Sequence, residues 1–217
     1  VKFHAFACGE EGGRSLCGNI LSTSAPSAPS NITAAQMNGA GGYTIPAGGN
    51  YQLTGDCTQG TSLICITSNN TNTVIWLNGH TITGRVICQF NCSGLEIYGG
   101  THNCATTDAT AIGCLSISDS ANGPATIKIH DITGANTVNA TGANAARWLN
   151  LDWSGTPTGI ITITISNLTL SMTNVTDAST QRVVNLNVNG PNNNHALVEL
   201  TNSSLTCGPV TATCQGI

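Results

Sequence analysis

Only 7% of the 217 residues are charged and 4% are aromatic, whereas globular proteins usually contain about 25% charged residues. With six Lys and Arg residues and a formal net charge of −4, the chain lacks the basic cluster that a nucleic-acid backbone requires. It also lacks the run of about 18 apolar residues that predicts a membrane span. The abundance of Thr, Ile, Val, Asn and Gly instead predicts an all-β protein with many turns.

Residues 1–42 differ from the rest of the chain, and we interpret them as an irregular, disulfide-tied N-terminal arm and a tether. Cys8 and Cys17 lie in its first part, and Ser, Ala and Pro dominate residues 21–30. That composition is typical of an extended, solvated linker, although spaced Ala-Pro and Ser-Pro also occur in O-glycosylated stalks. Because the chain begins at Val1, we also expect a mature chain whose targeting segment has been removed.

From residue 43 onward the chain is repetitive. Each of five segments contains a short strand of alternating apolar residues, a turn rich in Asn, Gly, Pro and Ser, and a second alternating strand. The segments start at Ser62, Arg85, Ile112, Arg147 and Arg182. A repeat of this kind is typical of stacked structural units.

The later segments align closely. The pairs Leu115/Ile117, Leu149/Leu151 and Val184/Leu186 recur at steps of 34 and 35 residues, and Ile127/Ile129, Ile163/Ile165 and Val198/Leu200 at steps of 36 and 35. Stacked coils bury apolar rows that a single coil leaves exposed, with about 4.8 Å between strands. The pattern predicts a parallel β-helix domain of about five or six coils over residues 43–217. A β-sandwich is the alternative, but long irregular connections, not two-residue turns, follow the second strands.

The stretch TVIWLNGHTITG (73–84), with ATIKIHDITGANT (125–137) and GIITITISNLTLSMTN (159–174), resembles the right-handed parallel β-helix superfamily, which includes pectate lyases, polygalacturonases and tailspikes. The likeness covers residues 43–206 and implies a single-stranded right-handed solenoid. It implies no particular activity, because this fold serves many functions. Within the first stretch we expect inward Ile75, Leu77 and Ile82, a corner at Asn78–Gly79, and a surface histidine, His80.

The chain has ten cysteines, an even number with no CxxC pair, which favours disulfides and an oxidising compartment over zinc. They are Cys8, Cys17, Cys57, Cys65, Cys88, Cys92, Cys104, Cys114, Cys207 and Cys214. Cys88 and Cys92 have a spacing that zinc sites use, but no second pair completes four ligands, so we predict no metal. Sequence alone leaves the pairing open, and we favour bridges between neighbours, such as Cys8–Cys17 and Cys207–Cys214.

Seven N-x-S/T sequons are candidate N-glycosylation sites, although a chain this rich in Asn, Ser and Thr contains several by chance. They lie at Asn31, Asn69, Asn91, Asn139, Asn167, Asn174 and Asn202. Together with the cysteines they predict a secreted, extracellular protein that carries covalent glycans.

A carbohydrate-cleaving β-helix requires clustered acids, and glycoside hydrolysis requires two carboxyl groups about 5–10 Å apart. The motif sets of polygalacturonases and pectate lyases are absent. Asp152 and Trp153 form the best candidate sugar contact, because an indole stacks on a sugar face and a carboxylate binds hydroxyls. Glu96 and Lys128 occupy matching outward positions on successive coils and predict a surface ion pair.

Arg85, Arg147 and Arg182 each open a segment, so they form a short basic edge if they stack, or stay independent if they do not. We predict no catalytic residues, metal or cofactor from these patterns. A catalytic role is therefore the less favoured interpretation.

The last segment ends in LTCGPVTATCQGI (205–217), which offers no helix to cover the end of a solenoid. Either a Cys207–Cys214 loop covers that end or another subunit does. We therefore expect an extracellular structural glycoprotein, a subunit of a fibre, coat or matrix that self-associates through uncapped ends and the N-terminal arm. The alternative is a carbohydrate-active enzyme or a polysaccharide-binding module.

Overall fold

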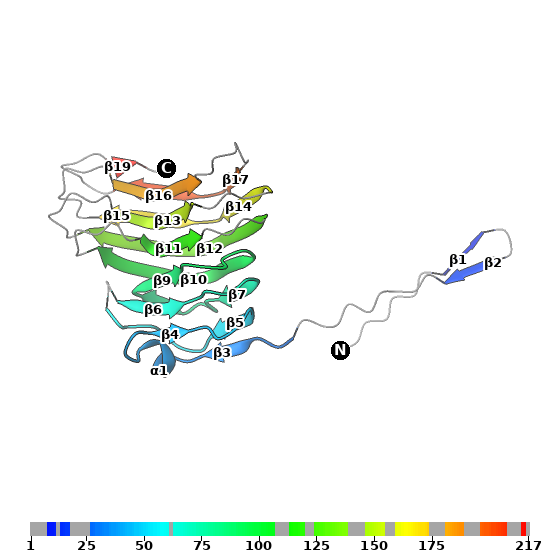
Figure 1. Cartoon of the computed structure of the whole chain (residues 1–217), viewed down its shortest axis with the longest axis horizontal. Coiled ribbons are helices and arrows are strands. Elements are labelled where there is room, and N and C mark those ends of the chain that lie inside the picture. The colour runs from blue at the N-terminus through cyan, green and yellow to red at the C-terminus, as the bar shows by residue number, and fades with distance from the viewer. Residues whose placement is uncertain are drawn as a thin grey trace.

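The computed structural model describes residues 8–11, 14–17, 27–60, 63–106, 113–119, 124–138, 146–154, 159–173, 181–188, 196–207 and 214–215. Most of these residues are in β-strands, which form two large parallel sheets (Figure 1). One sheet has ten strands and the other has seven, and we call them the long sheet and the short sheet. This confirms the all-β prediction, and two parallel sheets are consistent with a β-helix-like fold.

The long sheet contains β3 (Ser30–Ile32), β5 (Gly49–Leu53), β7 (Thr73–Trp76), β8 (Thr81–Thr83), β10 (Leu95–Thr106), β12 (Ala125–Val138), β14 (Ile161–Ser166), β15 (Thr169–Thr173), β17 (Ala196–Thr201) and β18 (Ser204–Cys207). The short sheet contains β4 (Tyr43–Thr44), β6 (Ile64–Thr67), β9 (Arg85–Cys88), β11 (Gly113–Asp119), β13 (Arg147–Trp153), β16 (Gln181–Val188) and β19 (Cys214–Gln215). A separate antiparallel pair is formed by β1 (Cys8–Glu11) and β2 (Arg14–Cys17).

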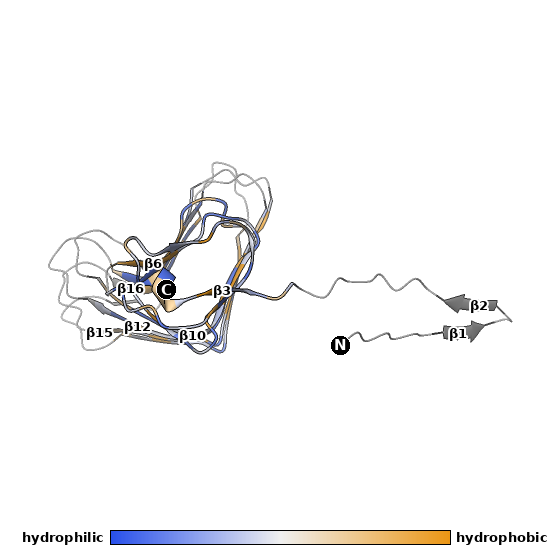
Figure 2. Ribbon diagram, turned by 90° about the horizontal axis from the view of Figure 1, so that it is seen from below, coloured by the Kyte–Doolittle hydropathy of each residue, from blue (hydrophilic) through white to orange (hydrophobic). Residues whose placement is uncertain are grey.

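The chain passes alternately between the two sheets, as the strand numbers show. The long sheet follows the order β17-β14-β12-β10-β7-β5-β3, and the short sheet follows β19-β16-β13-β11-β9-β6-β4. In Figure 2 the strands of successive levels superimpose around a shared interior. Each path contains seven strands, so the stack has more levels than the five or six coils predicted.

The predicted columns of apolar residues are present and form the core between the sheets. Leu149 pairs in register with Leu115 and Val184, and Ile163 pairs with Ile127 and Val198. Except for Val198, these side chains are fully buried. Because inward residues alternate with outward ones along each strand, a shared register stacks every aliphatic row on the row below.

The stack also includes residues before 43, which the prediction assigned to the arm and the tether. β3 pairs in parallel with β5, and the short helix α1 (Ala34–Met37) follows it. Thr33 caps the helix by accepting the N–H of Gln36, whose side chain accepts the N–H of Thr33 in return. Met37 and Ile32 are fully buried. The helix therefore helps to cover the N-terminal end of the stack.

Three disulfides join cysteines that are neighbours in sequence: Cys57–Cys65, Cys88–Cys92 and Cys104–Cys114. All six cysteines are buried, and each bridge joins two parts of the chain that are close in sequence. The predicted nearest-neighbour pairing is confirmed for these three bridges. In the hairpin, β1 and β2 place Cys8 directly opposite Cys17. Cys207 is also disulfide-bonded, and the side chain of Cys214 lies outside the described residues.

The long sheet bends at residues with left-handed backbone conformations. Gly99, Asp131, Asn167 and Asn202 have φ values of 78°, 56°, 54° and 49° and occupy the same position on successive levels. Gly, Asp and Asn tolerate this conformation better than other residues, which explains why they occupy the corner. The predicted corner at Asn78–Gly79 is of the same kind, with φ values of 53° and 76°.

Candidate functional site

The position of Trp153 does not suit the sugar contact predicted at Asp152 and Trp153. Trp153 lies in β13 on the same side as Leu149 and Leu151, and its side chain is fully buried in the core. Its ring therefore cannot stack on a sugar, and this part of the prediction was wrong. Asp152 is half-buried and points to the other face, where its Oδ1 accepts a hydrogen bond from Asn187 Nδ2 at 3.0 Å.

An exposed column of rings lies instead on the outer face of the long sheet. Trp76, Tyr98 and His130 follow one another in register on β7, β10 and β12. The rings of Trp76 and Tyr98 are 6.3 Å apart at 9°, and those of Tyr98 and His130 are 4.8 Å apart at 10°. Such offset stacks are favourable because of the quadrupole of each ring. Trp76 remains 36% exposed, so this column presents aromatic surface to solvent.

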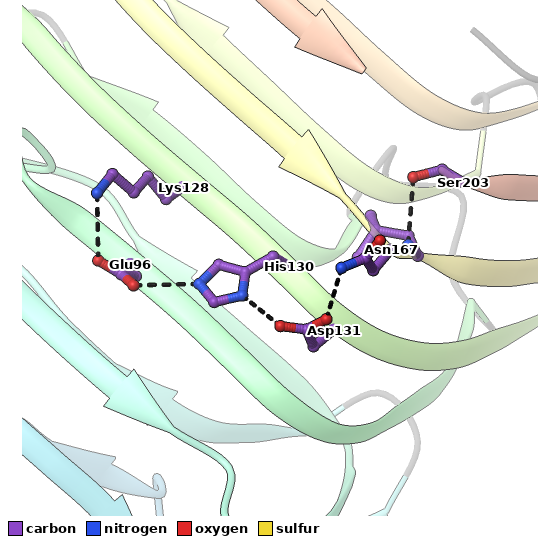
Figure 3. Close-up of polar contacts among 7 residues, drawn as sticks. Glu96, Lys128, His130, Asp131, Asn167 and Ser203 are labelled. Atoms are coloured by element: carbon purple, nitrogen blue, oxygen red, sulfur yellow. Dashed lines mark hydrogen bonds and ion pairs between the residues drawn. The ribbon is translucent and has the colours of Figure 1, made fainter. Parts of the chain in front are cut away.

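His130 also belongs to a charged network with Glu96, Lys128 and Asp131 (Figure 3). Glu96 and Lys128 pair in register, and Lys128 Nζ lies 3.8 Å from Glu96 Oε2, which confirms the predicted ion pair. The other oxygen of Glu96 lies 3.1 Å from His130 Nε2, and Asp131 Oδ2 lies 2.7 Å from His130 Nδ1. Both ring nitrogens therefore face carboxylate oxygens, which only accept.

This geometry favours the doubly protonated imidazolium form of His130. Burial acts to lower the pKa of His130, but the hydrogen bonds to Asp131 and Glu96 and the two negative charges outweigh it and raise the pKa above its usual value. With Lys128 and His130 positive and Glu96 and Asp131 negative, the network is close to neutral overall.

Asp131 and Asn167 extend the network along the corner column. Asn167 Nδ2 donates to Asp131 Oδ1 at 2.8 Å, and on the next level Ser203 Oγ accepts the backbone N–H of Leu168 at 3.2 Å (Figure 3). The hydrogen bonds from His130 and then Asn167 lower the pKa of Asp131. Glu96 and Asp131 thus each hold one ring nitrogen of His130.

The outer face of the short sheet carries a second polar ladder. Arg147 and Arg182 pair in register, and each donates through Nη1 to the asparagine three residues on, Asn150 and Asn185. Asn185 Nδ2 also donates to Asn150 Oδ1 at 3.0 Å. Burial lowers the pKa of Arg147, and the positive charge of Arg182 lowers it further.

The sequence left open whether Arg85, Arg147 and Arg182 stack. Arg147 and Arg182 lie on adjacent strands, whereas β11 lies between Arg85 on β9 and Arg147 on β13. Arg85 is therefore one level further from Arg147 than Arg182 is.

The third exposed feature is the C-terminal edge, which we define as β17 and β18. β17 pairs only with β14, and β18 only with β15, within the described residues. Val198 and Leu200 continue the columns of Ile163 and Ile165, yet they are 41% and 36% exposed. Leu197, on the opposite face of β17, is 51% exposed. Among the described residues, the apolar columns are thus only partly covered at this edge.

The described sequons differ in accessibility. Asn31, Asn91, Asn167 and Asn202 are exposed, and Asn69 is half-buried. Asn139 and Asn174 lie outside the described residues. The side-chain nitrogen of Asn167 donates a hydrogen bond to Asp131. The side-chain oxygen of Asn31 accepts a hydrogen bond from the side chain of Gln52, and that of Asn69 accepts one from the backbone N–H of Gln89.

Elsewhere, His80 is a surface residue at its corner, as predicted, with Nδ1 3.2 Å from Asp56 Oδ1. Among the described residues no three His, Cys, Asp or Glu side chains are grouped so that they could hold a metal ion. The part of the chain that the structure describes contains no helix of the length and apolarity needed to span a membrane.

A scan against protein-family models found no match, and searches of the curated proteins and of the solved structures found no significant match either. The exposed ring column could have been found in the sequence, because Trp76, Tyr98 and His130 each follow an inward isoleucine. The register that stacks them was needed to recognise it.

Proposed function

We propose that this protein is an extracellular structural glycoprotein, a right-handed β-helix whose copies join end to end into a fibre, coat or matrix. The observation that carries the proposal is the C-terminal edge. There the core columns stop at Val198 and Leu200, which remain exposed although the residues below them are buried.

The exposed edge has two costs that another subunit would remove. Full burial of an apolar side chain is worth roughly 1.5–3 kcal/mol, and Val198 and Leu200 forgo part of it because they are 41% and 36% exposed. The outer side of β17 also offers backbone N–H and C=O groups that can pair with a further strand. A strand added in parallel, as every strand of the two sheets is, would bury Leu200 and continue the ladder.

The two ends of the stack are unlike, which favours head-to-tail contacts over a symmetric dimer. The N-terminal end carries α1 and buries Met37 and Ile32, whereas the C-terminal end exposes Val198 and Leu200. A contact between unlike surfaces generates a ring if its rotation closes and a filament if it does not. The disulfides and the exposed sequons support an oxidising, extracellular location.

The test is the concentration dependence of assembly, measured by sedimentation velocity and negative-stain electron microscopy. The native protein is expected to form elongated assemblies, and Leu200→Asp is expected to leave it monomeric. Ile160→Asp is the matched control, because Ile160 is exposed but lies outside the C-terminal edge. Far-UV circular dichroism verifies that both variants fold. A native protein that stays monomeric at all concentrations contradicts the proposal, as does normal assembly of Leu200→Asp.

A second candidate is a polysaccharide-binding module, and the ring column favours it. Trp76 offers an exposed aromatic surface, and Glu96 and Lys128 offer polar groups on the neighbouring column. Isothermal titration against a panel of neutral and acidic polysaccharides tests this role. Binding that is lost in Trp76→Ala and retained in Phe90→Ala supports it, and no binding to any member of the panel contradicts it.

A further inference from the structure

Residues 1–4 of the arm repeat a pattern that belongs to the long sheet. The sequence there is VKFH, and the corresponding strand positions read LEIY (95–98), IKIH (127–130), ITIS (163–166) and VELT (198–201). VKFH has apolar residues at the first and third positions, as all four do. It is identical to IKIH at the second and fourth positions, Lys and His.

Each position of this pattern has a fixed role in the sheet. The first and third residues point inward and build the core columns, as Ile127 and Ile129 do. The second residue points outward in the column where Lys128 meets Glu96 at 3.8 Å. The fourth residue is in the column where His130 stacks on Tyr98. A segment with this pattern is therefore suited to become one more level of the long sheet.

The long sheet has room for one more level at its C-terminal edge. Above β17 no further strand is paired within the described residues. The upper surface there presents Val198 and Leu200 as exposed inward positions and Glu199 as an outward one. An added strand must therefore supply two apolar residues separated by one residue, and a positive charge between them complements Glu199.

We propose that residues Val1–His4 of a second copy of this chain add to β17 as a parallel strand. In this register Val1 covers Val198, Lys2 lies beside Glu199 and Phe3 covers Leu200. The pairing is strand addition at a sheet edge, in which backbone hydrogen bonds supply affinity and alternate side chains supply specificity. The inference rests on the proposed function and specifies which segment forms the joint.

The proposed pairing stops at His4 because the likeness weakens after it. Ala5 falls at the corner position where Gly99, Asp131, Asn167 and Asn202 have positive φ. A left-handed conformation costs an alanine roughly 1–2 kcal/mol, so the added segment does not follow the corner.

The arm reaches a second copy more directly than it reaches its own β17. It leads into Ser30 of β3, and β3 and β17 lie at opposite ends of the long sheet. Six steps of about 4.8 Å separate them, or roughly 29 Å along the stack. When the N-terminal end of one copy faces the C-terminal edge of the next, the arm spans only the joint between them.

The first experiment compares full-length variants by their critical concentration for assembly. Phe3→Asp is expected to raise it by roughly tenfold or more, because burial of the phenyl ring over Leu200 is lost. Phe90→Asp, at an exposed phenylalanine away from the edge, is the control and is expected to leave it unchanged. Lys2→Glu and Glu199→Lys are each expected to weaken assembly, and the double variant to restore it.

The second experiment identifies the contact and the copy that makes it. A photo-crosslinking amino acid at position 3 is introduced into chains labelled with ¹⁵N, which are mixed with unlabelled chains before assembly. Mass spectrometry is expected to find crosslinks between position 3 and residues 196–201, including pairs of one labelled and one unlabelled peptide. Crosslinks only within one chain, or none to residues 196–201, overturn the inference.

The two proposals fail in different ways. Elongated assemblies that persist in Phe3→Asp leave the structural function intact and overturn the joint proposed here. A native protein that never assembles overturns both.

Discussion

Val198 pairs in register with Ile163, yet Val198 is 41% exposed whereas Ile163 is fully buried. The two residues occupy one column of the core, and within the described residues only Ile163 has a paired strand on both sides. Substitution should reveal the difference. Ile163→Ala is expected to lower the free energy of unfolding by roughly 2–5 kcal/mol because it opens a cavity. Val198→Ala is expected to cost the monomer less than about 1 kcal/mol, measured by urea denaturation at a concentration below assembly.

His130 should make stability fall as the pH rises above the usual pKa of histidine. Its pKa is raised in the folded protein, so the folded state binds a proton more tightly than the unfolded state does. The stabilisation is complete below the unfolded pKa of about 6.5 and is lost as the pH rises through the folded pKa. Because the pairs are partly exposed, we expect a loss of about 1 kcal/mol or less.

The measurement is the free energy of unfolding from pH 6 to pH 9, compared with that of His130→Asn. The difference between the two proteins should shrink as the pH rises. Lys128→Gln is the control, since it leaves both carboxylate contacts of His130 in place. A difference that stays constant over this range would contradict the protonated network.

His102 should make stability fall at acidic pH, whereas His130 makes it fall as the pH rises. His102 is buried in the core, where its Nε2 donates to the carbonyl of Gly84 at 2.9 Å. The backbone carbonyl of His102 accepts a hydrogen bond from Trp148 Nε1, and the Trp148 ring packs edge-on against the imidazole ring. Burial lowers the pKa of His102 to about 4. The unfolded chain then binds more protons than the folded one between pH 6.5 and pH 4, and stability falls by roughly 3 kcal/mol as the pH drops across this window.

Nuclear magnetic resonance of the imidazole signals tests this directly, because His102 should remain neutral until the pH approaches 4. The variant His102→Gln retains a donor for the carbonyl of Gly84 and has no ionisable ring. It should be less stable than the native protein at pH 7, but its stability should not show the His102 loss between pH 6.5 and pH 4. A native His102 that titrates near 6.5 would contradict burial of the ring.

Asn167 should matter for its backbone conformation as well as for its side chain. Its φ of 54° is left-handed, and its amide donates to Asp131. Asn167→Ala is expected to cost roughly 1–3 kcal/mol, because it loses the hydrogen bond and places a Cβ atom in a disfavoured conformation. Asn167→Gly should recover the conformational part. Urea denaturation of the two variants compares them, and equal stability would show that the corner imposes no strain.

The buried bridge Cys104–Cys114 should stabilise the fold by an amount that grows with the logarithm of the length of the loop it closes. For a separation of 10 residues, replacing both cysteines by serine is expected to cost about 3 kcal/mol. The shorter bridge Cys88–Cys92, with a separation of 4, should contribute less, about 2 kcal/mol. Thermal unfolding of the two double variants tests the order, and peptide mapping of the unreduced protein verifies the pairing. The reverse order would contradict the loop-closure argument.

Several features of the fold could be predicted because they depend on short-range patterns. Alternation along a strand places every second residue inward, so the columns at Leu149 and Ile163 were predictable from equal steps in the sequence. Asn78–Gly79 was recognisable as a corner because few other residues adopt positive φ. The Glu96–Lys128 pair followed from matching positions in two successive segments.

The predictions failed where they depended on which face of a strand a side chain occupies, or on how many levels the stack contains. Trp153 was interpreted together with its neighbour Asp152, although alternation from Leu149 and Leu151 already places it inward. The ring column escaped notice because Trp76, Tyr98 and His130 are separated by unequal steps of 22 and 32 residues. The first level was missed because β3 has only three residues, too few for a periodic signal.

Composition and alternation were sufficient to predict the strands and the aliphatic columns at Leu149 and Ile163, because these depend on which side chains avoid water and on how a strand directs them. The level at which the core residues become exposed to solvent depended on contacts between residues far apart in the chain. Only the paired register shows that α1 covers one end while Val198 and Leu200 stay exposed at the other. That asymmetry is a property of the assembled stack, since the same aliphatic pattern occurs in buried and exposed levels alike.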